Sequence, residues 1–113
     1  MAYDENLADR VRAILLPEHG YSERKMFGGL CFMLDGNMVC GIVRDDLMLR
    51  LSHELADDAL LRPHVRPMDF TGRPMPSMVY VAPEGLRGRA LRRWVEQATA
   101  HARTLPPKIP RGA

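Results

Sequence analysis

Residues 26–43 read MFGGLCFMLDGNMVCGIV, with one apolar run on each side of Asp35-Gly36-Asn37. Asp-Gly and Gly-Asn are both typical of the tight two-residue turn of a β-hairpin. A third apolar run, over residues 46–51, follows a short charged connection, so the stretch predicts a three-stranded antiparallel meander. Gly28-Gly29, inside the first strand, predicts a β-bulge or a close approach by another part of the backbone.

The first two strands of this meander are apolar on both faces, a pattern typical of strands that are covered on both sides. We expect helices on one face, while the other face is either covered by a second subunit or only partly covered. The third strand alternates instead. Leu47, Leu49 and Leu51 are expected to face the core, and Met48 and Arg50 are expected to face outward.

Helical spacing of apolar residues recurs in three other parts of the chain. The predicted helices cover residues 4–16, residues 53–61, and the stretch that follows the turn at Pro83-Glu84-Gly85 and ends at residue 105; each ends shortly before a proline or glycine. Asp4 and Ser52 are suitable N-caps for the first two helices.

The segments between the helices are less regular. Residues 21–25 are predicted to be a polar connection, and residues 78–82 a strand. Residues 66–70 can form a short edge strand, whereas the prolines and glycine of residues 71–77 predict a loop. The order is therefore helix, three strands, helix, one or two strands, helix. This order predicts an α+β fold with helices packed on an antiparallel sheet.

The chain has 113 residues, of which 46% are hydrophobic. These values predict a single domain over residues 1–105, followed by a flexible tail over 106–113. No apolar run reaches the roughly 18 residues that a membrane span requires, and the N-terminus lacks the basic and apolar regions of a secretory signal. We therefore expect a cytoplasmic location and no membrane partner.

Basic residues are concentrated at the end of the chain. Residues 1–83 carry nine basic and twelve acidic residues, whereas residues 84–113 carry seven basic and two acidic ones. The candidate phosphate-contacting face of the last helix consists of Arg89, Arg92, Arg93 and Arg103. Such a face can contact nucleic acid weakly, although a solvated helix face is the alternative reading. No recognition-helix motif accompanies these arginines.

The two cysteines lie on the first hairpin. A turn at Asp35-Gly36 places Cys31 directly opposite Cys40, within reach of a disulfide, whereas a turn at Gly36-Asn37 places them diagonally. In a reducing cytosol we expect two buried thiols, with a redox role as the alternative. The four histidines are scattered and have no metal-ligand spacing, so no metal site, cofactor site or catalytic residue is predicted.

Eight methionines are many for a chain of this length. Methionine forms adaptable surfaces that repack around partners, but it also fills cores. Methionines in a proline-rich segment are hard to bury, and exposed apolar groups beside arginine are typical of interfaces. The candidate interaction loop therefore comprises Arg66, Met68, Phe70, Arg73 and Met75.

Several of these features recur together in one protein family. The residues that carry the resemblance are Met26, Phe27, Gly28 and Gly29, then Asp35 and Gly36, the alternating run 47–51, the strand 78–81, and Pro83-Glu84 before a helix with Trp94. Over nearly its whole length the chain resembles the N-terminal domain of the TfoX/Sxy family of bacterial competence regulators.

This resemblance implies a two-layer sandwich with the order α-β(3)-α-β(2)-α. The name-giving members activate competence genes, act with a cyclic-AMP-responsive transcription factor and carry a second, helical C-terminal domain. This chain ends at residue 113, so we expect a stand-alone N-terminal domain. The resemblance brings no catalytic residues, metal ligands or cofactor with it.

Three functional hypotheses follow. The first is a non-enzymatic regulatory domain that binds proteins, forms a homodimer and has a transcription factor as partner. The second is a nucleic-acid-associated protein that uses the basic last helix. The third is a small enzyme of unknown type, which no nucleophile, base or cofactor motif supports.

Overall fold

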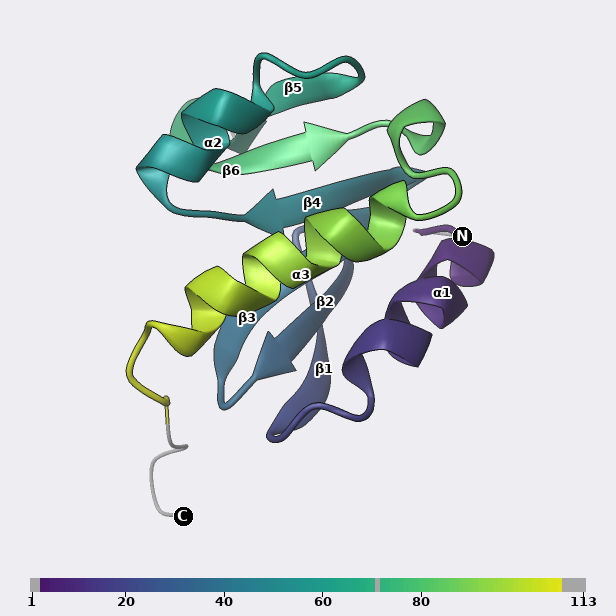
Figure 1. Ribbon diagram of the computed structural model, residues 1–113, viewed down its shortest axis with the longest axis vertical. Helices are drawn as coiled ribbons and strands as arrows, with labels where there is room; N and C mark the ends of the chain where they lie inside the picture. The colour runs from purple at the N-terminus through teal and green to yellow at the C-terminus, as the bar shows by residue number, and fades with distance from the viewer. Residues whose placement is uncertain (1–2, 71, 109–113) are drawn as a thin grey trace.

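The computed structural model describes residues 3–70 and 72–108, except for the side chains of Phe70, Arg73 and Pro74. It has an α+β fold with one open antiparallel sheet (Figure 1). The helices are α1 (Glu5–Leu15), α2 (His53–Ala59) and α3 (Ala90–Arg103), with a short 3-10 helix, η1 (Pro83–Gly85), before α3. The strands are β1 (Tyr21–Met26), β2 (Gly29–Leu34), β3 (Asn37–Val43), β4 (Asp46–Arg50), β5 (Val65–Phe70) and β6 (Arg73–Val81). The strand order across the sheet is β1-β2-β3-β4-β6-β5.

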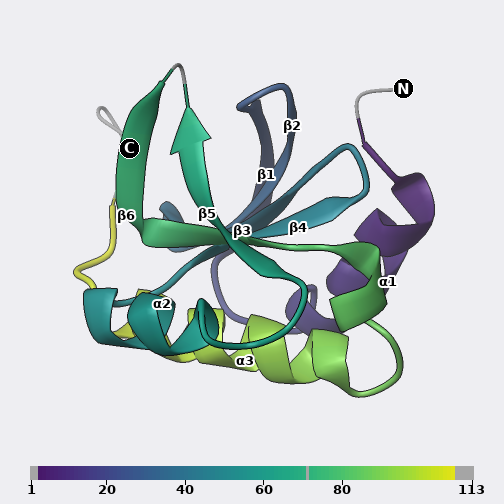
Figure 2. The ribbon, with the colours of Figure 1, turned by 90° about the horizontal axis from the view of Figure 1, so that it is seen from above.

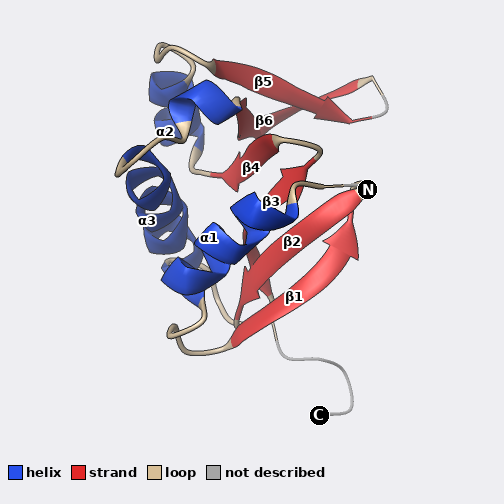
Figure 3. Ribbon diagram, turned by 90° about the vertical axis from the view of Figure 1, so that its right-hand side faces the viewer, coloured by secondary structure: helices blue, strands red, loops and turns tan. Residues whose placement is uncertain are grey.

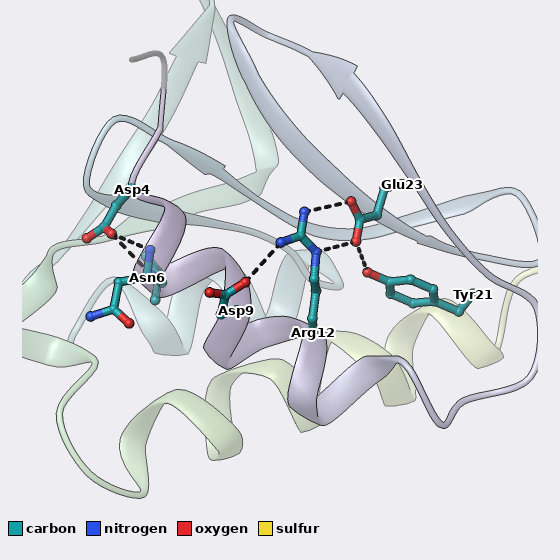
Figure 4. Close-up of polar contacts among 7 residues, drawn as sticks. Asp4, Asn6, Asp9, Arg12, Tyr21 and Glu23 are labelled. Atoms are coloured by element: carbon teal, nitrogen blue, oxygen red, sulfur yellow. Dashed lines mark hydrogen bonds and ion pairs between the residues drawn. The ribbon is translucent and has the colours of Figure 1, made fainter.

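Helix α1 forms where the apolar spacing predicted it. The Asp4 side chain accepts hydrogen bonds from the backbone N–H groups of Asn6 (2.9 Å) and Leu7 (3.2 Å), which caps the first turn (Figure 4). Leu7, Val11 and Leu15 are buried beneath the helix. The predicted cap at Ser52 is also confirmed, because its hydroxyl accepts the N–H of Leu55 (3.1 Å).

Four strands, not three, separate α1 from α2. Residues 21–25, predicted to be a polar connection, form most of β1, and this prediction was wrong. Residues 22–25 are exposed, because β1 is an edge strand that is held by backbone pairing with β2. A strand of this kind has no alternation of buried and exposed side chains, so hydrophobic pattern alone does not reveal it.

The first two hairpin turns use left-handed backbone conformations. Phe27 (φ 57°) and Gly28 (φ 74°) connect β1 to β2, and Asp35 (φ 50°) and Gly36 (φ 81°) connect β2 to β3. Positive φ at both central residues is the signature of a type I′ turn. Gly28 therefore belongs to a turn, and the predicted bulge was wrong. The alternative, a close backbone approach, is confirmed at Gly29, where a Cβ would lie 1.9 Å from the carbonyl oxygen of Ile42.

A register shift in the second hairpin separates the two cysteines. The turn falls at Asp35-Gly36, but an irregularity after Phe32 shifts the pairing, and Val39 is the extra residue. Cys31 consequently lies opposite Gly41, and Cys40 opposite Phe32. The two thiols are free, buried and on opposite faces of the sheet. The geometry for a cross-strand disulfide, which the sequence left open, is therefore absent.

The hairpin of β5 and β6 is longer than predicted. Strand β6 begins at Arg73, so most of the predicted loop over residues 71–77 is strand, and Thr71 lies outside the described residues. Prolines are tolerated in β6 because β4 pairs with it only from Met78 to Val81. The predicted edge strand over residues 66–70 is confirmed as part of β5.

All three helices lie on one face of the sheet (Figure 3). Beneath them is the helix-side core, whose fully buried members include Phe32, Ile42, Leu47, Leu49, Val79 and Val95. The sheet curves so that the hairpins β1–β2 and β5–β6 project away from the helices (Figure 2). Among the described residues, no helix is long and apolar enough to span a membrane.

Candidate interaction groove

The face of the sheet turned away from the helices carries a second apolar cluster. Its buried residues are Cys31, Met33, Met38, Met48, Met68 and Met78, with Met26, Phe27, Val43, Met75 and Tyr80 partly buried around them. We call this set the methionine cluster. It contains every methionine of the described chain, whereas the helix-side core contains none.

The methionine cluster is buried within a single chain. Met48 lies on the face opposite Leu47 and Leu49, as predicted, but it is buried there, with 0% exposure, instead of facing solvent. The curvature of the sheet brings Met68, from the far edge strand β5, into the same cluster as Met33 on β2. Burial of this face therefore needs no second subunit.

An open groove of about 460 Å³ lies at one end of this face. It is lined by Met38, Arg50, Met75, Pro76, Ser77 and Met78. Arg50 ends β4 and lies opposite Met78 in the sheet. Volumes of this size are typical of ligand clefts.

Among the groove residues whose side chains the structure describes, Arg50 is the charged one. It is half-buried, and no carboxylate of the described residues lies within ion-pairing distance of it. Burial lowers the pKa of His101 on α3, and the positive charge of Arg50 lowers it further. Arg50 was expected to face outward, and it was not predicted to be a functional residue. The one sign of a role in the sequence is a charged residue at the end of an apolar strand.

The candidate interaction loop is divided by the fold. Met75 lines the groove, but Met68 is only 1% exposed, so the expectation that it would be exposed was wrong. A register irregularity between Pro67 and Asp69 accompanies the burial of Met68 in the cluster. The side chains of Phe70 and Arg73 lie outside the described part of the structure.

Arg66 lies at another part of the same sheet face. Its guanidinium pairs with Asp46 (2.6 Å) and lies over the Tyr80 ring, 4.7 Å from the centroid. Its hydrogen bond to Asp46 raises the pKa of Arg66, and burial raises the pKa of Tyr80.

The candidate phosphate-contacting face is also divided. Arg89, Arg92 and Arg93 are exposed near the start of α3, and Arg92 lies 3.9 Å from Glu96. Arg103 lies at the other end of α3, about 20 Å farther along the helix. Its guanidinium is directed toward the connection between α1 and β1 and the turn between β2 and β3, away from the other three arginines.

Arg103 joins three segments. It donates hydrogen bonds to Asp35 (3.0 Å), to Glu18 (3.2 Å) and to the backbone oxygen of His19 (3.0 Å). These three contacts within the fold engage the guanidinium of Arg103, and its contact with phosphate stays a prediction.

The turn at Asp35-Gly36 is a meeting point of distant segments. The Asp35 backbone oxygen accepts the N–H of Lys108 (2.7 Å), and the Asn37 side chain donates to the backbone oxygen of Pro106 (2.9 Å). The first three residues of the predicted tail, 106–108, are thus held against the sheet, and residues 109–113 lie outside the described residues.

The residues that carry the family resemblance in the first two hairpins occupy positions that the fold itself requires. Met26 and Phe27 pack against the methionine cluster. The two hairpin turns contain Gly28 in the first and Asp35-Gly36 in the second. Gly29, at the start of β2, lies against the backbone of Ile42.

A polar network of Arg12, Tyr21 and Glu23 links α1 to β1 (Figure 4). Arg12 donates to both carboxylate oxygens of Glu23 (2.6 and 2.9 Å) and to Asp9 (3.1 Å), and the Tyr21 hydroxyl donates to Glu23. Arg12 lowers the pKa of Glu23, while burial and the bond to Glu23 raise the pKa of Tyr21.

These shifts have a chemical consequence. They keep each group of the network in its usual charge state at neutral pH, whereas acid–base catalysis favours a pKa near neutrality. The network therefore has the properties of a structural contact that holds α1 against β1.

The pKa values of the two cysteine thiols are also shifted away from neutrality. Burial raises the pKa of Cys31 to about 11 and raises that of Cys40 as well, which leaves both neutral at physiological pH. Among residues 3–70 and 72–108, no group of three or more His, Cys, Asp or Glu side chains is arranged to hold a metal ion.

Comparison with known proteins gives one family. Residues 14–102 match the family model described as the TfoX N-terminal domain. No curated protein and no solved structure matches the chain.

Proposed function

Because this chain belongs to the TfoX N-terminal domain family, we propose that it is a non-enzymatic regulatory domain that acts by binding a protein partner. The observation that carries this proposal is the open groove beside the methionine cluster. Its walls are flexible thioether side chains, which adapt to the shape of a partner. We propose transcriptional regulation as the setting, as in the family's competence regulators, with a transcription factor as the partner.

The polar chemistry of the protein supports a binding role. The Arg12 network and the Arg103 contacts each connect elements of the fold. The buried thiols have pKa values too high for a nucleophile at physiological pH.

The experiment is photo-crosslinking in the cells that carry the protein. Met75 in the groove is replaced by p-benzoyl-phenylalanine, and exposed Ser22 on β1 is replaced in a matched control. We expect a discrete adduct with one protein from position 75 and none from position 22. Absence of an adduct at position 75, or the same adducts at both positions, would contradict binding at the groove.

The start of α3 favours nucleic-acid binding as a second candidate function. Arg87, Arg89 and Arg93 are exposed there, and the first turn contains no acidic residue. The positive end of the helix dipole adds to this attraction for phosphate.

Anisotropy of labelled duplex DNA across a salt series tests this candidate. We expect salt-sensitive binding that R89Q/R93Q weakens and that the control R24Q, on exposed β1, weakens less. Equal effects of the two variants would show that α3 is not the site.

A further inference from the structure

We propose that the groove at the end of β4 binds an apolar peptide segment that carries a carboxylate, and that Arg50 pairs with this carboxylate. The proposal rests on the proposed function and specifies the chemistry of the partner. It is carried by one half-buried guanidinium among methionine side chains.

Arg50 differs from Arg66 and Arg103 in both its burial and its ion pairing. Arg66 and Arg103 are more exposed than Arg50, yet each has a carboxylate partner, at 2.6 Å and at 3.0 Å respectively. Arg50 has none among the described residues. A guanidinium that is partly removed from water gains most from a partner that supplies a negative charge.

The other residues that line the groove determine which side chains can lie next to the bound carboxylate. Met38, Met75 and Met78 supply apolar, unbranched walls, and Pro76 adds a rigid apolar surface. Apolar side chains next to the carboxylate would therefore be buried along with it.

A carboxylate fits this site better than a phosphate does. Arg50 supplies one positive charge, which a singly charged carboxylate neutralises, whereas a phosphate group near neutral pH carries up to two negative charges. A second cation would be needed for the phosphate, and among the residues whose side chains the structure describes, no lysine and no other arginine lines the groove.

The groove is also open, so a bound molecule would remain exposed along one side. A fatty acid has a carboxylate and an apolar tail, but its tail gains most from an enclosed cavity. An open groove instead suits a segment that belongs to a larger partner. These properties favour a peptide.

A random-peptide phage library selected on the purified protein provides the probes. The selected peptides are synthesised with their Asp or Glu residues intact and replaced by Asn or Gln. Fluorescence polarisation then measures binding to wild type, R50Q, R50K and the control R24Q, with circular dichroism to verify that each variant is folded.

We expect the amide peptides to bind the wild type about tenfold more weakly than the acidic ones, as for loss of a charge-assisted hydrogen bond. R50Q should remove this difference, R50K should retain part of it, and R24Q should leave it unchanged. Met75→Glu should weaken every selected peptide through repulsion in the groove.

Other outcomes would overturn the proposal in distinguishable ways. Peptides that bind at the groove but show no preference for an acid would refute the role of Arg50 and leave the proposed function standing. Binding of dodecanoate that depends on Arg50, with no peptide selected, would identify a lipid ligand instead. Failure of the proposed function itself appears separately, as the absence of an adduct at position 75.

Discussion

At the residue scale, the two adjacent glycines of the family signature have different reasons to be glycine. Gly28 has a φ of 74°, and a Cβ there would meet no atom within 4 Å. Gly29 has an ordinary φ, but a Cβ there would overlap the Ile42 carbonyl oxygen at 1.9 Å. Conformation constrains the first position, and space constrains the second.

This difference predicts opposite tolerance to substitution. G28N should cost less than about 1 kcal/mol of unfolding free energy, because asparagine tolerates the left-handed region. G29A should cost about 2–4 kcal/mol, because its Cβ must displace the backbone of β3. Urea denaturation of the two variants measures both values. Equal losses would show that the close approach at Gly29 is not limiting.

At the element scale, charged side chains attach the helices to the edges of the sheet. Glu23 accepts two hydrogen bonds from Arg12 and one from Tyr21, and this joins α1 to the edge strand β1 (Figure 4). Arg103 performs the same role for the end of α3. Each attachment reaches a segment whose side chains are mostly exposed: β1 in the first case and the connection over residues 16–20 in the second.

Replacement of Glu23 should destabilise the protein in a pH-dependent way. The pKa of Glu23 is lowered in the folded state, so its stabilising effect is present above its unfolded pKa and is lost as the pH falls through the folded value. E23Q should therefore cost about 1 kcal/mol at neutral pH, and the difference from wild type should shrink in acid. Denaturation at several pH values measures this. D9N, which removes a more exposed partner of Arg12, is the control and should have a smaller effect.

Replacement of Arg103 tests the attachment of α3 to the turn at Asp35-Gly36. R103Q should lower the unfolding free energy by about 1 kcal/mol, because Asp35 and Glu18 lose their shared partner. R93Q, on the same helix but exposed, should change it by less than about 0.5 kcal/mol. Amide hydrogen exchange at Lys108 should rise in R103Q if this attachment holds the Asp35 turn. Unchanged exchange and stability would mean that Arg103 is dispensable to the fold.

At the scale of the whole molecule, the curved sheet buries apolar side chains on both of its faces. Helices cover one face, and the projecting hairpins enclose the methionine cluster on the other (Figure 2). The apolar character of β2 and β3 on both faces was one reason to predict a homodimer. The chain itself supplies that cover, so the homodimer stays a prediction that rests on other grounds.

This arrangement predicts that folding does not depend on association. The midpoint of urea unfolding should be the same over a wide range of protein concentrations, because each chain buries both faces of its own sheet. Sedimentation velocity at the same concentrations reports the assembly state independently. A midpoint that rises with concentration would show that a second subunit completes the fold.

The sequence by itself determined the features that depend on neighbouring residues. The N-cap at Asp4, the turn at Asp35-Gly36 and the apolar spacing of α1 and α3 all follow from short patterns. In each case the residues that specify the feature lie within a few positions of one another, where local sterics and periodicity act.

Only the tertiary structure decided the features that join distant parts of the chain. Strand β1 exists through pairing with β2, and Cys31 and Cys40 are separated by one extra residue in the facing strand. Arg103 is bound to Asp35, 68 positions away, and Arg50 lies among methionines from β3 and β6. Contacts of this kind depend on how the sheet curves and which edges meet, and no local sequence pattern encodes that geometry.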